Sequence, residues 1–177
     1  MTLATAGAQS LAPLPHDRLA GLERFYGGPG SFPEHHDGEC TVFADGWAVV
    51  ICTNWARAVR RIEGPERCEL FGFLSDEVPE SAIARQCGGH DFAVVDGRFL
   101  VDGWAKEIDR CAKVAVFDLE DEATAAEVLR LYGPRAKWPR NHELEAAVDA
   151  ESAEERAQAL AGAKLWRRTQ QRDPALG

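Results

Sequence analysis

The sequence predicts an α+β fold in which N-terminal helices pack on a small antiparallel β-sheet and a helical tail follows. Three observations lead to this prediction. Apolar side chains recur every three or four residues in the N-terminal third, which is the helical period. Two apolar runs flank Asp96-Gly97, a pair typical of a tight type I′ hairpin turn. Beyond Trp138-Pro139 the composition changes to Ala, Glu, Arg and Gln, and a helix start signal follows.

Two helices are expected in the N-terminal third of the chain. The first covers His16–Tyr26, with Asp17 in a suitable N-cap position and a Gly- and Pro-rich run directly after it. The second covers Cys40–Ile62, where one apolar face keeps the helical period until Gly64-Pro65 ends it. We therefore expect a long helix that begins at Cys40.

The same second segment has an alternative interpretation. The β-branched run Val49-Val50-Ile51 favours a strand, and Asp45-Gly46 would turn a hairpin between the runs TVFA and WAVVIC. We favour the helix because its period persists through the whole segment.

The middle of the chain supplies the predicted sheet. Its strands are expected at Arg67–Leu74, Asp91–Val95, Arg98–Asp102 and Lys113–Leu119, of which the central two form the hairpin. A helical turn is expected at ESAIARQ before the hairpin. An amphipathic helix is expected at Glu122–Leu131, where Gly133-Pro134 ends it.

We divide the chain into an α+β domain at residues 1–140 and a helical C-terminal extension at residues 141–177. The run Ser152-Ala-Glu-Glu155 is a capping box that opens a helix to about Gln170. The apolar face of this helix is thin, so we expect it to dock through Leu160 and Trp166, on the core or on a partner.

Composition excludes several classes of function. The chain has 177 residues and a formal net charge of -9, and an acidic protein repels phosphate backbones, so we expect no nucleic-acid partner. No apolar run reaches the roughly 18 residues that span a bilayer, so we expect no membrane partner. The first fifteen residues contain no Lys or Arg and do not resemble a signal peptide, which predicts a cytoplasmic location.

The cysteines predict reactivity rather than cross-linking. Five are present, at Cys40, Cys52, Cys68, Cys87 and Cys111, and no two make a C-x-x-C pair. An odd number without a signal peptide argues against a disulfide scaffold, and the spacing argues against a structural zinc site. We expect buried thiols and one reactive thiolate.

A histidine and an aspartate lie at the two open ends of the predicted hairpin. In a tight hairpin centred on Asp96-Gly97, positions pair when their numbers add up to about 193, so His90 lies opposite or diagonal to residue 102 or 103. Cross-strand neighbours are about 5 Å apart at Cβ. We therefore expect Asp102 to orient the His90 imidazole, as a third group orients a catalytic base.

The nucleophile that such a base would serve is expected at a helix N-terminus. Cys40 follows Asp-Gly-Glu and begins the predicted long helix. Free backbone N–H groups and the positive end of the helix dipole favour a thiolate there. Cys52 is the rival, because Cys52-Thr-Asn-Trp55 would open a shorter helix if WAVVI is a strand.

These residues resemble a superfamily over roughly residues 26–104. A Cys at a helix N-terminus, a strand with His, and a hairpin with Asp follow one another in papain-like and transglutaminase-like cysteine hydrolases. The matching runs are Gly38-Glu-Cys40-Thr-Val-Phe-Ala44 for the nucleophile, Gly64-Pro-Glu-Arg-Cys-Glu-Leu-Phe-Gly-Phe73 for the next strand, Gly89-His90-x-Phe-Ala-Val-Val for the His strand and Asp-Gly-Arg-Phe-Leu-Val-Asp102 for the Asp strand. The resemblance implies a papain/transglutaminase-like core.

The resemblance also implies an activity. It is that of a cysteine-dependent hydrolase or acyl-transferase acting on a peptide, isopeptide or side-chain amide, with a protein or peptide as substrate and no cofactor. Cys40 would attack the carbonyl, His90 would carry the proton and Asp102 would hold the His tautomer. The backbone N–H of Cys40 and a second donor would meet the oxyanion, and His36, Asn54 and a main-chain amide stay open as that donor.

Two other functions are compatible with the sequence. The first is a non-catalytic protein of the inhibitor or immunity type, which keeps the fold and binds through its acidic surface and C-terminal helix. The second is a metal site made by His35, His36 and Cys40 with His90. Consecutive His side chains point in different directions, so we expect no bound metal.

Overall fold

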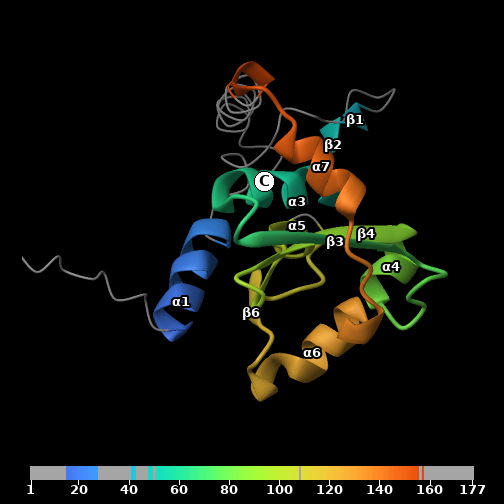
Figure 1. The fold of residues 1–177 in the computed structure, drawn as a ribbon. Helices are drawn as coiled ribbons and strands as arrows, with labels where there is room; N and C mark the ends of the chain where they lie inside the picture. Colours follow the sequence, from blue (N-terminus) through green and yellow to red (C-terminus); the bar gives the residue numbers. More distant parts are fainter. Residues whose placement is uncertain are drawn as a thin grey trace, which may run out of the picture.

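The computed structural model describes residues 15–27, 41–42, 48–49, 51–107, 109–155 and 157. The expected α+β class is confirmed, because helices surround a four-stranded antiparallel sheet of strand order β3-β4-β5-β6 (Figure 1). Its strands are β3 (Cys68–Leu74), β4 (Gly89–Val95), β5 (Phe99–Val101) and β6 (Val116–Asp118). Strands β3, β5 and β6 fall inside the segments predicted as strands, whereas β4 begins at Gly89, before its predicted start at Asp91.

The predicted helix over Cys40–Ile62 is wrong in its first half. Helix α3 (Cys52–Glu63) begins twelve residues later, and an antiparallel pair, β1 (Thr41–Val42) and β2 (Ala48–Val49), precedes it. Ile51 is extended, with φ of -88° and ψ of 159°. Val49 in β2 and Ile51 thus have the extended backbone that β-branched side chains prefer, as the alternative interpretation expected. Cys40 and Asp45-Gly46 lie outside the described residues.

The remaining helices include three that the sequence predicts and three that it does not. They are α1 (Pro15–Tyr26), α4 (Ala82–Cys87), α5 (Gly103–Glu107), α6 (Glu122–Tyr132), the short 3-10 helix η1 (Arg135–Lys137) and α7 (His142–Asp149). Helices α4 and α6 begin at side-chain caps, Ser81 and Asp121, each of which accepts a backbone N–H bond from the first turn. The sequence predicts α1, α4 and α6 but not α5, η1 or α7, because the only helix expected after residue 140 begins at Ser152.

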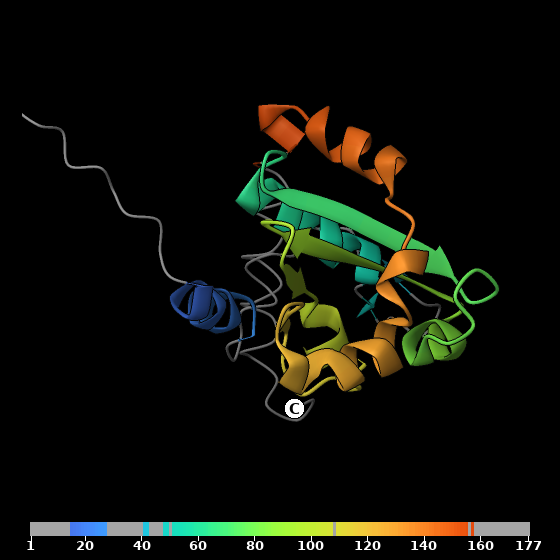
Figure 2. The same ribbon diagram turned by 60° about the horizontal axis from the view of Figure 1, so that its bottom comes forward.

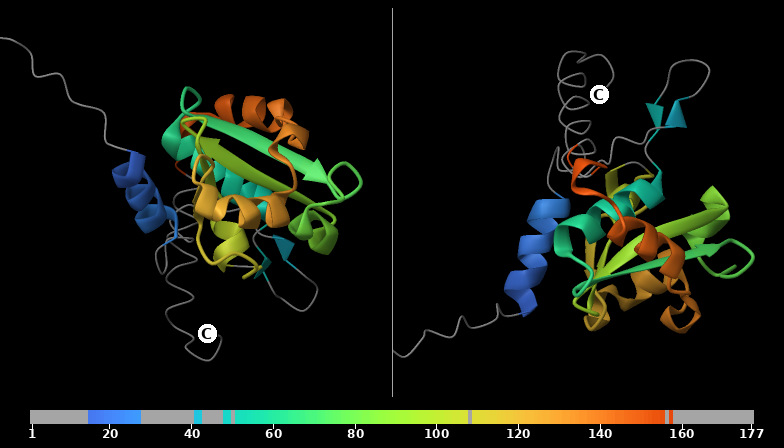
Figure 3. Two further views of the ribbon diagram at one scale, coloured as in Figure 1. Left: turned by 90° about the horizontal axis from the view of Figure 1, so that it is seen from below. Right: turned by 45° about the horizontal axis from the view of Figure 1, so that its top comes forward.

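The helices form layers on the two sides of the sheet. Helices α3 and α7 lie on one side of β3 and β4, and α6 lies on the other (Figures 1 and 2). Helix α1 contacts β5 and β6 at one end of the molecule, whereas α4 lies at the opposite end (Figure 3). In the described part of the chain, no helix is long and apolar enough to cross a membrane.

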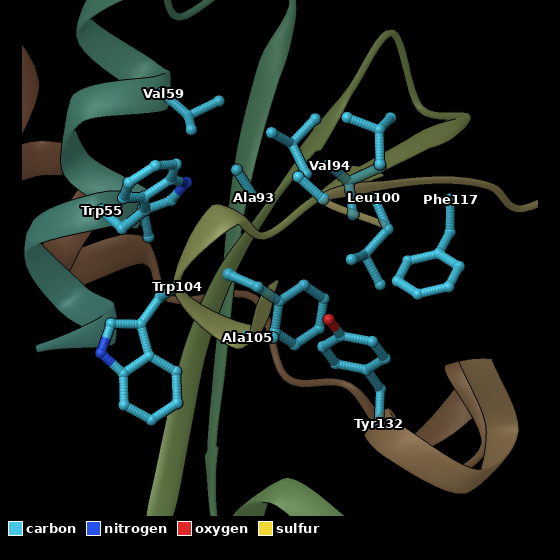
Figure 4. Packing of buried hydrophobic residues seen from close by; sticks show 14 of the residues in the cluster. Trp55, Val59, Ala93, Val94, Leu100, Trp104, Ala105, Phe117 and Tyr132 are labelled. Atoms are coloured by element: carbon cyan, nitrogen blue, oxygen red, sulfur yellow. The ribbon is translucent and has the colours of Figure 1, made fainter. Parts of the chain in front are cut away.

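Both faces of the sheet carry buried apolar side chains. Trp55 and Val59 of α3 pack on one side of the strands, and Phe117 and Tyr132 pack on the other (Figure 4). The second side is rich in aromatic rings, since Phe92 makes ring contacts with Tyr132 and with other neighbours. Burial of these large side chains is the main stabilising contribution to the sheet and its helices.

The hairpin turn is of the predicted type, but its register differs by one residue. Asp96 and Gly97 have φ of 55° and 65°, as a type I′ turn requires. Ala93 pairs with Val101, so paired positions add up to 194 rather than 193. The extra residue in the turn is Arg98. Its carbonyl accepts a hydrogen bond from the backbone N–H of Leu119, which directly follows β6, the other neighbour of β5 in the sheet. A shift of one residue changes the face of every side chain, and the observed register puts positions 90, 92 and 102 on one face.

The helical extension begins with α7, which packs against β3 and α3. Glu145 of α7 is 5% exposed and accepts a hydrogen bond from the backbone N–H of Leu70 at 2.9 Å. The predicted capping box is confirmed, because Ser152 and Glu155 exchange backbone and side-chain bonds. The domain boundary at residue 140 stays a prediction, and Leu160 and Trp166 lie outside the described residues.

Candidate thiol–imidazole site

Cys52 is the first residue of α3. The extended backbone of Ile51 directs the chain into the helix at this point. The N–H groups of Cys52 and Thr53 belong to the first turn, where no residue within the helix can accept their bonds. The thiol is half-buried. The helix N-terminus expected at Cys40 is therefore found at Cys52, and Cys40 itself lies outside the described residues.

The side chain of Cys52 lies against the start of β4. Its Sγ accepts a hydrogen bond from the backbone N–H of Asp91, with a nitrogen–sulfur distance of 3.5 Å. The thiol also interacts favourably with the protonated ring of the preceding residue, His90. A thiolate at this position would have the helix N-terminus, a backbone N–H and an imidazolium as its neighbours.

His90 and Asp102 form the predicted pair. The distance from Nε2 of His90 to Oδ2 of Asp102 is 2.5 Å, and both side chains are almost completely buried. His90 lies in β4 and Asp102 directly follows β5, and the two side chains lie on one face of the hairpin within hydrogen-bond distance, as predicted. Nδ1 of His90 is buried and has no hydrogen-bond partner. Because Asp102 occupies Nε2, Nδ1 is the ring nitrogen left to face the Cys52 thiol.

The surroundings of His90 favour its charged form. Burial lowers the pKa of an imidazole, and this is the largest single effect on His90. The charge of Asp102, its hydrogen bond and the Cys52 side chain act in the opposite direction, and together they raise the pKa of His90 above its ordinary value. An imidazolium is therefore expected in the resting protein near neutral pH.

Asp102 is held in place by two further bonds. Its Oδ1 accepts the backbone N–H of Ala105 at 3.0 Å, so it caps the short helix α5. Its Oδ2 accepts the hydroxyl of Tyr132 at 2.9 Å. The following Gly103 is also required, because a Cβ there would lie 1.7 Å from a ring atom of Trp55. Asp102 thus links the hairpin, α5 and α6.

Tyr132 is a site residue that the sequence analysis missed. It ends α6, thirty positions after Asp102, and no local pattern connects the two. The available signal was general, since a buried tyrosine hydroxyl usually requires a hydrogen-bond partner. Burial and the neighbouring Asp102 charge raise the pKa of Tyr132 well above its ordinary value, so it remains a donor.

Aromatic rings enclose the imidazole. The ring centroid of His90 lies 5.4 Å from that of Trp104, 5.9 Å from that of Tyr132 and 6.0 Å from that of Phe92. These rings exclude water from the His90–Asp102 pair, and a low-dielectric environment strengthens their interaction.

An open pocket of about 460 Å³ gives access to the thiol. Cys52 and His90 line it, together with residues from β3, the start of β4 and the N-terminus of α7. Asn54, one of the oxyanion donors considered from the sequence, is 2% exposed and does not line this pocket. His36, another of those donors, lies outside the described residues. A substrate carbonyl in the pocket would meet Cys52 and the first turn of α3.

The other described cysteines have less favourable surroundings. Burial raises the pKa of Cys68 to about 12. Burial also raises the pKa of Cys87, which lines the same pocket, and that of Cys111. A raised pKa reduces the thiolate fraction. Among the described thiols, only that of Cys52 forms a hydrogen bond with the strand that carries His90, and its side chain contributes to the raised pKa of the imidazole.

The described residues contain no group of three or more His, Cys, Asp and Glu side chains that could hold a metal ion. His35, His36 and Cys40, the metal ligands considered from the sequence, lie outside this part of the chain. Comparisons with protein-family models, with curated proteins and with solved structures find no match for the chain.

Proposed function

We propose that the protein is a cysteine-dependent hydrolase or acyl-transferase that acts on a peptide, isopeptide or side-chain amide. Cys52 is the nucleophile, His90 is the general base and acid, and Asp102 orients the imidazole. One observation carries the proposal: a half-buried thiol at a helix N-terminus faces an imidazole whose other nitrogen is bound to a buried carboxylate. This is the arrangement that activates a sulfur nucleophile.

The order of these groups supports the proposal. The thiol at a helix N-terminus comes first, the His strand second and the Asp after the hairpin third, as in the papain-like and transglutaminase-like superfamily that the sequence resembles. The nucleophile moves from Cys40 to Cys52 because the helix begins there. A papain/transglutaminase-like core is part of the proposal.

The reaction proceeds in two steps. The Cys52 thiolate attacks the substrate carbonyl, a thioester forms between Sγ and the acyl group, and the amine leaves with the proton that His90 donates. Water or a second amine then attacks the thioester and gives a proton to His90, which releases the acid or the new amide and restores the Cys52 thiolate. Asp102 keeps the proton on Nε2 when His90 is neutral, so that Nδ1 can accept the next one.

The oxyanion forms beside the first turn of α3. The backbone N–H groups of Cys52 and Thr53 are donors that the helix itself does not use. Fixed donors of this kind stabilise the developing charge because they need no reorganisation during the reaction. A main-chain amide, one of the three donors considered from the sequence, is the one we propose.

The proposal is tested by trapping the acyl-enzyme. The full-length protein is mixed with p-nitrophenyl acetate, and the mass of the intact protein and the adduct position are followed. We expect one acetyl group on Cys52, followed by its release and by turnover beyond one equivalent. Cys52→Ala should abolish both, whereas Cys87→Ala, which removes the other thiol of the pocket, should leave them unchanged.

The competing function gives a different result. A non-catalytic inhibitor or immunity-type protein would show slow acetylation spread over several nucleophiles and no turnover above that of Cys52→Ala. That outcome would remove the enzyme proposal.

A further inference from the structure

The pocket beside Cys52 has an acidic wall. The carboxylates of Asp91 and Glu77 line it, and no Lys or Arg of the described chain does. Neither carboxylate forms an ion pair with a described residue, although many other acidic side chains of the protein are paired with arginines. The one cation of the described chain that lines the pocket is the His90 imidazolium, and it is already paired with Asp102, so the two carboxylates of the wall have no cationic partner of their own among the described residues.

The carboxylate of Asp91 is held in a defined position. Its Oδ2 accepts the hydroxyl of Thr53 at 2.5 Å, and its Oδ1 accepts the side-chain amide of Asn141 at 3.2 Å. The partner of Asp91 in the sheet is Gly72, where a Cβ would lie 1.9 Å from Oδ1. Three segments of the chain thus make room for this carboxylate and fix it.

Asp91 lies directly beside the nucleophile. Its backbone N–H donates a hydrogen bond to Sγ of Cys52, and its side-chain carboxylate lines the same pocket. A carboxylate held there is useful when it attracts a substrate of the opposite charge.

Glu77 contributes the second negative charge. Its Oε2 accepts the backbone N–H of Leu74 at 2.7 Å, which anchors an otherwise exposed side chain at the pocket mouth. A further feature marks the same pocket as a ligand site, because His90 lines it and the buried Nδ1 of this residue has no hydrogen-bond partner.

We propose that this pocket selects acyl substrates that carry an ammonium or guanidinium group close to the reacting carbonyl, with Asp91 and Glu77 as the specificity-determining carboxylates. The inference rests on the proposed function for the reacting carbonyl, whereas the charge preference of the pocket stands on its own geometry. A Lys or Arg side chain of a peptide supplies such a group.

The test measures the charge preference at Cys52 without needing a natural substrate. The full-length protein reacts with cationic 2-(trimethylammonium)ethyl methanethiosulfonate or with anionic 2-sulfonatoethyl methanethiosulfonate, and peptide mapping quantifies the adduct at Cys52. Rates are divided by those of free cysteine. Both reagents need the same thiolate, so the ratio of the two rates reports the pocket charge alone.

We expect the cationic reagent to react about tenfold faster at low ionic strength, with the preference falling as salt is added. Asp91→Asn and Glu77→Gln should each reduce the ratio. Asp76→Asn, which removes an exposed charge from the same loop outside the pocket, should leave it unchanged. If Asp91→Asn does not fold, Glu77→Gln and the salt dependence still test the charge preference of the pocket.

A ratio near one, or a ratio that neither Asp91→Asn nor Glu77→Gln changes, would overturn the inference. Failure of the proposed function has another signature, because the reactivity of Cys52 would then be independent of His90 while the charge ratio could persist.

Discussion

The hydroxyl of Tyr132 donates a hydrogen bond to Oδ2 of Asp102, the same oxygen that binds the His90 imidazole. This bond connects the end of α6 to the end of the hairpin, thirty positions earlier in the chain. It fixes the carboxylate against rotation, and the carboxylate in turn fixes the ring. Tyr132 is thus a positioning residue in the proposed mechanism.

Tyr132→Phe should therefore slow the alkylation of Cys52 and change its pH profile. Loss of a buried hydrogen bond to a charged group should also lower the free energy of unfolding by about 1–3 kcal/mol. Tyr26→Phe is the matched control, because Tyr26 is equally buried and donates to Glu63 far from the site. Urea denaturation should show a loss for both variants, and only Tyr132→Phe should alter the pH profile. Identical profiles for the two would remove the positioning role.

The pKa of the His90 imidazole should lie above the ordinary histidine value of about 6.5. The pKa is raised in the folded state, so the stabilisation by the His90–Asp102 pair is complete below the pKa of the unfolded state and is lost as pH rises through that of the folded state. NMR titration of the ring measures the pKa of His90. Urea denaturation across alkaline pH measures the loss of stability.

Two variants test whether the His90–Asp102 pair causes the raised pKa. Asp102→Asn removes the charge that raises the pKa of His90 and leaves the burial that lowers it, so the ring should then titrate below its ordinary range. In His90→Asn, the free energy of unfolding should no longer show the decline at alkaline pH that is due to the His90–Asp102 pair. An imidazole that titrates at its ordinary value in the unaltered protein contradicts the ion pair.

Glu145→Gln should destabilise the protein by about 2–4 kcal/mol, because it breaks a buried charged network between α7 and β3. Glu145 accepts bonds from Leu70 and Arg140 and pairs with Arg60. Burial opposes ionisation, but these partners together lower the pKa of Glu145, so its contribution is present above the unfolded pKa and is lost as pH falls through the folded one.

The matched control is Glu143→Gln, on the exposed side of the same helix, which should change the free energy of unfolding by less than about 0.5 kcal/mol. Guanidinium denaturation of both variants at neutral and acid pH measures the difference. Equal stability of the two would show that α7 adds little to the core.

Local chemistry explains which parts of the fold were predictable. The Asp96-Gly97 turn was recognisable because few residue pairs adopt positive φ at both positions, and it brought His90 and Asp102 together. The helix start at Cys52 was harder, because the apolar period runs through β2 and α3 alike. The extended backbone of Ile51, which separates the two, follows from β-branching rather than from periodicity.

Long-range partners could not be predicted in this way. The bond from Tyr132 to Asp102 and that from Asn141 to Asp91 join residues 30 and 50 positions apart. Their side chains carry no mutual pattern in the sequence, and only the packing of α6 and α7 on the sheet brings them close. The residue that shifts the register, Arg98, is likewise bonded to a distant segment, because its carbonyl accepts the backbone N–H of Leu119, directly after β6.

The most direct test of the thiol–imidazole site is the rate of alkylation of each cysteine by iodoacetamide across pH. Cys52 should react fastest at about pH 6, where an unpaired thiol is mostly protonated. His90→Ala should slow Cys52 by about tenfold or more and leave Cys87, in the same pocket, unchanged. Cys52 is not the nucleophile of a thiol–imidazole pair if it reacts no faster than Cys87, if His90→Ala does not change its rate, or if Cys40 reacts first.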